Sequence, residues 1–393
     1  MISFENTEIA FRRKSKFQLK KAYFLFKIIA SSNLVKISQK LVLLATTLHI
    51  PIKWAIKPTI YSHFCGGETI QESLPTIQDL EKYNVKGILD YSVEGKESEE
   101  DIKAALEETL KTIKNAKDSG NTPFAVFKPT AFTSHHILKK VSEGGALTPE
   151  EEKEAQKFRD RVNILCSEAF HLDIPILIDA EDVWFQRFID DTVNSMMALY
   201  NKEKAIVFNT FQMYRVDRLD YLKKSYDMAV AGNYYLGAKF VRGAYMEKER
   251  ERAKEGGYPD PIQPTKDATD NDFNAALKFS MDHIDRIYIF NGTHNEYSSQ
   301  YLRQLMEEKG IAKNDPRVYF SQLYGMSDHI SFNLGYAGYN VAKYVPYGPV
   351  KHVLPYLFRR AEENTSAKGQ TGRELSLILT EMERRKRLPA VIN

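Results

Sequence analysis

Eight short apolar or β-branched runs recur along residues 85 to 348, and stretches with helical spacing separate them. The runs are VKGILDYS (85–92), PFAVFKPT (123–130), PILIDAE (175–181), AIVFNTFQ (205–212), GAKFVRGAY (237–245), RIYIFNGTH (286–294), VYFSQLYG (318–325) and NVAKYVPYG (340–348). Strands that alternate with helices predict βαβ units and a parallel sheet, and eight such units fit closure into a TIM-type (β/α)8 barrel.

The chain outside these runs predicts helices at both ends. Apolar residues at helical spacing in residues 21–48 indicate a helical N-terminal segment that packs on the barrel, and residues 61–84 read as a connector. We predict three parts: a helical segment with its connector (1–75), the barrel (76–370) and a helical C-terminal tail (371–393). Thr148, Pro149 and Glu151 have the spacing of a capping box, which predicts a helix that starts there.

A barrel of this kind carries its active site at the carboxyl ends of its strands. The residues at the predicted strand ends are Asp90, Lys128, Asp179, Gln212, Tyr245, His294, Gln322 and Tyr344. A further helix, YLFRRAEENTS (356–366), follows the eighth strand and carries Arg359 and Arg360. Because Lys343 and Tyr344 precede it on that strand, we interpret the arginine pair as a binding site for a small anion.

The same residues are compatible with other chemistries. Asp179, Glu181 and His294 could ligate a metal as in a barrel hydrolase, but no His-x-His ends the first strand, so we expect no metal. Lys128 could form a Schiff base or pair with a carboxylate, and its position leaves both open. Neither G-x-G-x-x-G nor a Walker loop occurs, so a nucleotide cofactor would need a binding site of another kind.

Composition narrows the partners and the compartment. The net charge of +3 comes from interspersed charges, which argues against nucleic acid. Basic clusters near both ends favour solvated helix faces over contact with an anionic membrane. With only Cys65 and Cys166, a reducing compartment is expected. The start of the chain shows neither a secretory signal nor a transit peptide, so we expect a cytoplasmic location or the matrix side of the mitochondrial inner membrane.

Seven segments, in order and spacing, resemble motifs of the proline dehydrogenases over nearly the whole chain. They are GILDYSVEG (87–95), ILIDAED (176–182), FNTFQMY (208–214), KFVRGAY (239–245), THN (293–295), QLYGM (322–326) and YLFRRAEEN (356–364). The forms NTFQ and VRGAY are closer to the monofunctional, mitochondrial-type branch than to the large bifunctional bacterial enzymes.

The resemblance implies an FAD-dependent enzyme that oxidises L-proline to pyrroline-5-carboxylate by hydride transfer to the flavin. It also implies transfer of the electrons to a quinone or another acceptor, with peripheral membrane contact possible. Oxidation of hydroxyproline is the same-class alternative. The different-class alternatives are a metal-dependent barrel hydrolase and an inactive, membrane-associated binding protein.

Site roles follow from the resemblance by position. Arg359 and Arg360 would bind the substrate carboxylate with Lys128, and Tyr245, Tyr344 and Tyr356 would wall the pocket. Asp179 and Lys239 would act at the flavin's reactive edge. The remaining cofactor contacts would be Ala180, Gln212, Arg242, Gly243, Ala244, Thr293, His294 and Glu363. Glu94 would close over the substrate as a gate by pairing with Arg359. Many bacterial relatives carry arginine where this chain has Lys239. Lysine keeps the positive charge of that arginine but lacks its planar guanidinium group.

Overall fold

The computed structural model describes residues 2–48, 50–93, 97–120, 122–366 and 370–387. The chain forms two compact units. Unit 1 contains Met1–Gly87, Ser92–Glu94 and Gln322–Asn393, and unit 2 contains Ile88–Tyr91 and Gly95–Ser321. The domain boundaries expected at residues 75 and 370 stay a prediction.

The eight predicted runs all form strands. They are β1 (Lys86–Tyr91), β2 (Ala125–Phe127), β3 (Ile176–Ile178), β4 (Val207–Gln212), β5 (Leu236–Val241), β6 (Ile287–Gly292), β7 (Val318–Leu323) and β8 (Val341–Tyr347). The sheet order is β1-β8-β7-β6-β5-β4-β3-β2, and β2 to β7 pair in parallel. At the two ends of this order, Lys128 after β2 binds Asp90 of β1 at 2.7 Å. The predicted (β/α)8 barrel is confirmed.

The strand register shows which side chains point into the barrel. The ring of Phe124 contacts the rings of Phe208, Phe290 and Tyr319 at centroid distances between 4.8 and 5.5 Å. Lys239 pairs with Phe290 in the register, so it lies on the same, interior side. Side chains alternate between the two faces of a strand, so every second residue points into the barrel. At the carboxyl ends of the strands these interior residues are polar, and they lie next to the apolar core.

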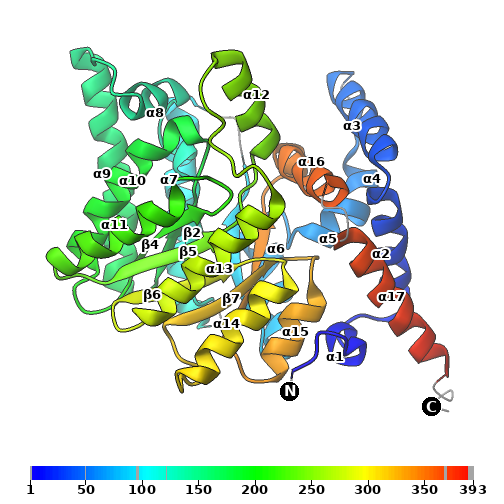
Figure 1. The fold of residues 1–393 in the computed structure, drawn as a ribbon. Helices are drawn as coiled ribbons and strands as arrows, with labels where there is room; N and C mark the ends of the chain where they lie inside the picture. The colour runs from blue at the N-terminus through cyan, green and yellow to red at the C-terminus, as the bar shows by residue number, and fades with distance from the viewer. Residues whose placement is uncertain (1, 49, 94–96, 121, 367–369, 388–393) are drawn as a thin grey trace. The chain divides into compact units, whose positions relative to one another are not determined.

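The strands of unit 2 alternate with amphipathic helices, which Figure 1 shows beside the sheet. These helices are α7 (Glu99–Ser119), α8 (His135–Ser142), α9 (Pro149–Leu172), α10 (Val183–Tyr200), α11 (Arg218–Ala231), α12 (Met246–Gly256), α13 (Lys266–Asp282) and α14 (Glu296–Glu308), with a short turn, η2, at Pro129–Ala131. The capping box predicted for α9 is present, with Thr148 and Glu151 each accepting the other's backbone N–H. A left-handed Gly257 ends α12.

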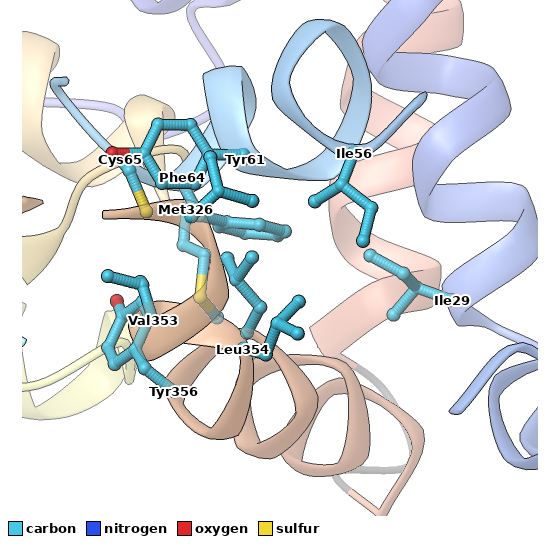
Figure 2. Close-up of a cluster of buried hydrophobic side chains, with 11 residues drawn as sticks. Ile29, Ile56, Tyr61, Phe64, Cys65, Met326, Val353, Leu354 and Tyr356 are labelled. Carbon is cyan, nitrogen blue, oxygen red and sulfur yellow. The ribbon is translucent and has the colours of Figure 1, made fainter. Parts of the chain in front are cut away.

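Unit 1 holds the helices from both ends of the chain. They are α1 (Thr7–Phe11), α2 (Lys16–Ile29), α3 (Ser32–Thr47), α4 (Lys53–Ile56), η1 (Lys57–Tyr61), α5 (Ser62–Phe64), α6 (Ile70–Glu81), α15 (Asp328–Tyr336), α16 (Val350–Ser366) and α17 (Gln370–Arg387). One apolar cluster joins Ile29 and Ile56 of the N-terminal helices to Leu354 and Tyr356 of α16 (Figure 2). A second joins α1 and α2 to α17, which runs beside α2 in Figure 1.

The expectation that residues 61–84 form a connector was wrong, because twelve of them form helix α6. Thr69 caps its start by accepting the N–H of Glu72, and Ile77 and Leu80 are buried on its inner face. Pro75 and the preceding glycines obscured the helical pattern. Burial of that apolar face stabilises the helix despite the backbone bond that Pro75 cannot donate. No helix in the described part of the chain has the length and hydropathy of a membrane span.

Candidate active site

Two buried ion pairs mark the carboxyl ends of the strands in unit 2. The Nζ of Lys128 lies 2.7 and 2.9 Å from the two carboxylate oxygens of Asp90. The Nζ of Lys239, on β5, lies 2.5 Å from Asp179 at the end of β3. Lys239 is only 5% exposed, and Asp179 places a carboxylate against its ammonium group where little water reaches. The predicted strand-end residues therefore meet as lysine–carboxylate pairs.

Hydrogen bonds hold the loop after β3 in place at Glu181. Its carboxylate accepts bonds from Thr130 at 2.8 Å and from the hydroxyl of Tyr245 at 3.0 Å. Its backbone N–H donates to Gln186, and its carbonyl accepts from the amide of Gln212 at 2.7 Å. Residues of four other segments thus converge on one buried residue that the site prediction left out. The signal was present, since Glu181 continues the alternation of Leu177 and Asp179 on the interior side.

The environment of Glu181 changes its acidity. Burial raises the pKa of its carboxyl group to about 7, while the bond from Thr130, the charge of Lys128 and the bond from Tyr245 act in the opposite direction. A carboxyl group that titrates near neutral pH inside a barrel mouth is typical of a functional site. It can carry a proton under conditions in which an exposed glutamate cannot.

Arg242, at the end of β5, is fixed in a network beside the N-terminus of α14. Its guanidinium binds Asp270 at 2.8 Å and donates to the hydroxyls of Thr293 at 2.6 Å and Ser298 at 3.0 Å. The ring of Phe273 lies 4.4 Å away on one face. A guanidinium, two hydroxyls and a helix N-terminus together favour an anionic group such as a phosphate.

The residue after Arg242 must be glycine. Gly243 has a φ of +132°, and a Cβ added there would lie 2.4 Å from the ring of Tyr214. The other predicted cofactor contacts differ in exposure: Ala180 and His294 are half-buried, and Ala244 is exposed. Their roles, and that of Gln212, stay predictions.

The predicted substrate residues of unit 1 lie on β8 and α16. The guanidinium of Arg360 stacks 5.1 Å above the ring of Tyr356, which belongs to the apolar cluster in Figure 2. Tyr344 is buried, and its carbonyl accepts the N–H of Tyr324 at 2.8 Å. Arg359 is half-buried. Their assigned roles stay predictions. Glu94 and the side chain of Glu363 lie outside the described residues.

Two strand residues of unit 1 point toward helix α15 rather than into the barrel. Gln322 accepts a bond from Ser331 of α15 at 2.7 Å, so it points toward that helix. Lys343 is fully buried and binds Asp328 of α15 at 2.9 Å, so it adds no charge to an anion site next to Tyr344. The reason is the alternation of a strand: neighbouring side chains point to opposite faces, and a one-residue difference changes the face.

These features define a (β/α)8 barrel with buried, paired cations at its strand ends. A family model described as "Proline dehydrogenase" matches residues 73–373 of the chain. The chain belongs to the proline dehydrogenase family.

Similar proteins agree with this family. "Proline dehydrogenase 1, mitochondrial" of Drosophila melanogaster is 42% identical over 249 residues, which cover 61% of this chain and 37% of the fly protein. "Carbapenem antibiotics biosynthesis protein CarD" of Pectobacterium carotovorum is 35% identical over 326 residues, 83% of this chain and 84% of that protein. The chain thus matches well under half the length of the fly relative.

A solved structure supports the barrel fold. Proline utilization A from Bdellovibrio bacteriovorus, inactivated by N-propargylglycine, superposes with a TM-score of 0.73 and 19% sequence identity. The match covers 94% of this chain and 40% of that chain.

Proposed function

We propose that this protein is an oxidoreductase that uses FAD to oxidise L-proline to pyrroline-5-carboxylate. The observation that carries the proposal is the buried Lys239–Asp179 pair at the barrel's strand ends, in a chain of the proline dehydrogenase family. In this reaction the ring carbon next to nitrogen loses a hydride and the nitrogen loses a proton, so that a C=N bond forms.

The residues of unit 2 fit a flavin. Lys239 supplies a fixed positive charge. A Cβ added at Gly292, on the neighbouring strand, would lie 3.1 Å from the carbonyl oxygen of Phe240, 3.2 Å from the side chain of Val241 and 4.0 Å from the Cε of Lys239, so a larger residue at Gly292 would crowd the space beside this charge. The Arg242 network at the start of α14 has the donors that phosphate oxygens require. When bound, FAD would supply the hydride acceptor.

We assign the substrate roles from the motifs of the chain. Arg359 and Arg360 bind the carboxylate of proline, since two guanidinium groups provide charge-assisted bonds to one small anion. Lys128 contributes a third cation, which Asp90 holds in one position. The tyrosines at 245, 344 and 356 exclude water from the ring and orient it.

The finer assignments of the cofactor follow the same motifs. Asp179, Ala180 and Gln212 would contact the flavin ring, and the positive charge of Lys239 would favour its reduced, more negative form. Gly243, Ala244, Thr293 and His294 would hold the rest of FAD with Arg242, and we assign Glu363 to the same group from its motif alone. From the resemblance alone, Glu94 would pair with Arg359 when substrate is bound.

We further propose that the electrons pass to a membrane quinone and that the protein contacts the membrane peripherally. The fly relative is named as a mitochondrial protein. We therefore propose the matrix side of the inner membrane, or the cytoplasmic face of a bacterial one.

The test is a turnover assay with a soluble dye as electron acceptor. The purified protein should carry flavin that acid extraction identifies as FAD, and o-aminobenzaldehyde should trap pyrroline-5-carboxylate formed from L-proline. If the flavin-containing protein reduces the dye with another secondary amine and not with proline, the assignment of proline as substrate is wrong. Protein without flavin that cannot be reconstituted by added FAD would overturn the reaction.

A further inference from the structure

The N-terminal helices carry a strong local positive charge. No aspartate or glutamate occurs between Glu8 and Glu68, a stretch that contains eleven of the 55 lysines and arginines. The rest of the chain has 44 basic residues against 52 acidic ones, so it is net negative. Lys16, Lys20, Lys27, Lys36 and Lys40 of α2 and α3 are exposed and have no ion-pair partner within the described residues.

Helix α3 exposes an apolar stripe next to these charges. The stripe and its continuation beyond the helix consist of Leu34, Ile37, Leu41, Leu44 and Leu48, at alternating spacings of three and four residues. Each is between 47 and 61% exposed. The opposite side of α3 packs inward, where Val35 is buried and Val42 contacts the cluster of Figure 2. The stripe therefore points away from the core of unit 1.

Helix α2 and the segment after α3 expose more apolar side chains. Phe17 and Phe24 on α2 are 76 and 61% exposed, while Phe26 on its other side packs against α17. Trp54 of α4 is 77% exposed. Helix α3 follows α2 directly in the chain, and the two helices contact each other (Figure 1). We call these exposed apolar and basic residues of positions 16–54 the basic-apolar surface.

Charge decides between the two occupants that could cover such a surface. A second copy of the chain in a symmetric dimer would bring the same uncompensated lysines against one another, which costs free energy. The stripe also spans only two heptads, whereas a coiled coil needs about three to four. An anionic bilayer satisfies both halves of the surface, because apolar side chains enter the acyl boundary and lysines reach the headgroups.

We infer that the basic-apolar surface docks this protein on an anionic lipid bilayer, with α2 and α3 lying on the membrane. The inference deepens the peripheral membrane contact proposed above and rests on it. It assigns that contact to named residues of the N-terminal helices. Aromatic side chains such as Phe24 and Trp54 favour the interface between headgroups and acyl chains.

The experiment is flotation of the 393-residue protein with two kinds of vesicle, phosphatidylcholine alone and phosphatidylcholine mixed with phosphatidylglycerol. We expect flotation with the anionic vesicles and its loss at high salt. Reversing two charges, Lys36→Glu and Lys40→Glu, should weaken partitioning by at least about 25-fold, since each basic residue contributes about fivefold. The triple variant Ile37→Gln, Leu41→Gln and Leu44→Gln should also lose flotation.

Matched controls change equally exposed residues elsewhere. They are Lys103→Glu with Lys111→Glu on α7, and Leu199→Gln with Val216→Gln. The controls should float like the parent. A second readout uses Trp54, one of the chain's two tryptophans. In a Trp184→Phe protein its emission should shift to the blue on anionic vesicles.

Each outcome decides the inference. Equal flotation of the surface variants and the parent would overturn it, as would equal binding to neutral and anionic vesicles. A concentration-dependent dimer that the triple variant abolishes, with vesicle binding unchanged, would assign the surface to a second copy. Dye-linked proline oxidation is measured in parallel: its loss in the parent protein would overturn the proposed function, whereas retained oxidation without flotation would overturn only the docking surface.

Discussion

Replacing Glu249 with glutamine should change how the stability of the protein depends on pH. Glu249 lies on α12, is fully buried, and accepts the N–H of Val183 at the start of α10 at 2.7 Å. Burial raises the pKa of its carboxyl group from 4.5 to about 7. The bond from Val183 lowers it, the charge of Asp182 raises it, and the charges of Arg215 and Lys248 lower it.

The sign follows from proton linkage. Between pH 4.5 and about 7 the unfolded chain has lost the proton of Glu249 while the folded chain keeps it, so the free energy of unfolding falls as pH rises through this range. The shift of about 2.5 units corresponds to about 3 kcal/mol, because each unit is about 1.4 kcal/mol. Glutamine keeps the size and the acceptor oxygen for Val183 but cannot ionise. Above the folded pKa, Glu249→Gln should therefore be more stable than the parent by up to about 3 kcal/mol.

Urea unfolding followed by circular dichroism measures this difference. We expect parent and Glu249→Gln to coincide within about 0.5 kcal/mol at about pH 4.5 and to separate by about 3 kcal/mol near pH 8. Glu251→Gln is the control, because Glu251 is exposed on the same helix. A constant offset between parent and Glu249→Gln at both pH values would refute the reasoning, since it would show that the carboxylate is not penalised by burial.

Three further predictions concern the proposed site. Arg360→Met should lower kcat/KM for proline by about 10- to 100-fold with flavin content unchanged, as expected for the loss of a charged hydrogen bond; normal efficiency would reject the carboxylate assignment. Arg242→Glu places a second carboxylate beside Asp270 and should give folded protein depleted of flavin. The ratio of flavin to protein absorbance measures the flavin content. Full flavin occupancy in this variant would reject Arg242 as a cofactor-binding residue. Tyr344→Ser should narrow the preference for proline over trans-4-hydroxy-L-proline, which we expect to be about 10- to 200-fold in the parent; equal efficiencies in the parent would favour the hydroxyproline alternative.

The sequence predicted the elements of the barrel because their signals are local. Each strand is a short apolar run, and the start of α9 is specified by Thr148 and Glu151 alone, three residues apart. The same reasoning missed α6, whose pattern contains Pro75. Its stability comes from burial against neighbours that the sequence does not reveal.

Contacts between residues that are far apart in the sequence could be predicted only in part. Their positions at the ends of predicted strands were enough to nominate Asp179 and Lys128 as site residues. Those positions could not show that Asp270, 28 residues from Arg242, would bind that guanidinium. Lys343 lies inside β8, which runs to Tyr347, and the sequence does not show that its side chain faces α15 while that of its neighbour Tyr344 faces the opposite side.

An anaerobic titration with L-proline tests the central claim most directly. If the strand ends of this barrel bind FAD and the chain oxidises proline, the purified protein is yellow. Proline then bleaches the flavin absorption bands without any other acceptor, and a protein carrying Lys239→Met bleaches more slowly. A flavin spectrum that stays unchanged at saturating proline, in protein that dithionite reduces normally, would contradict the account.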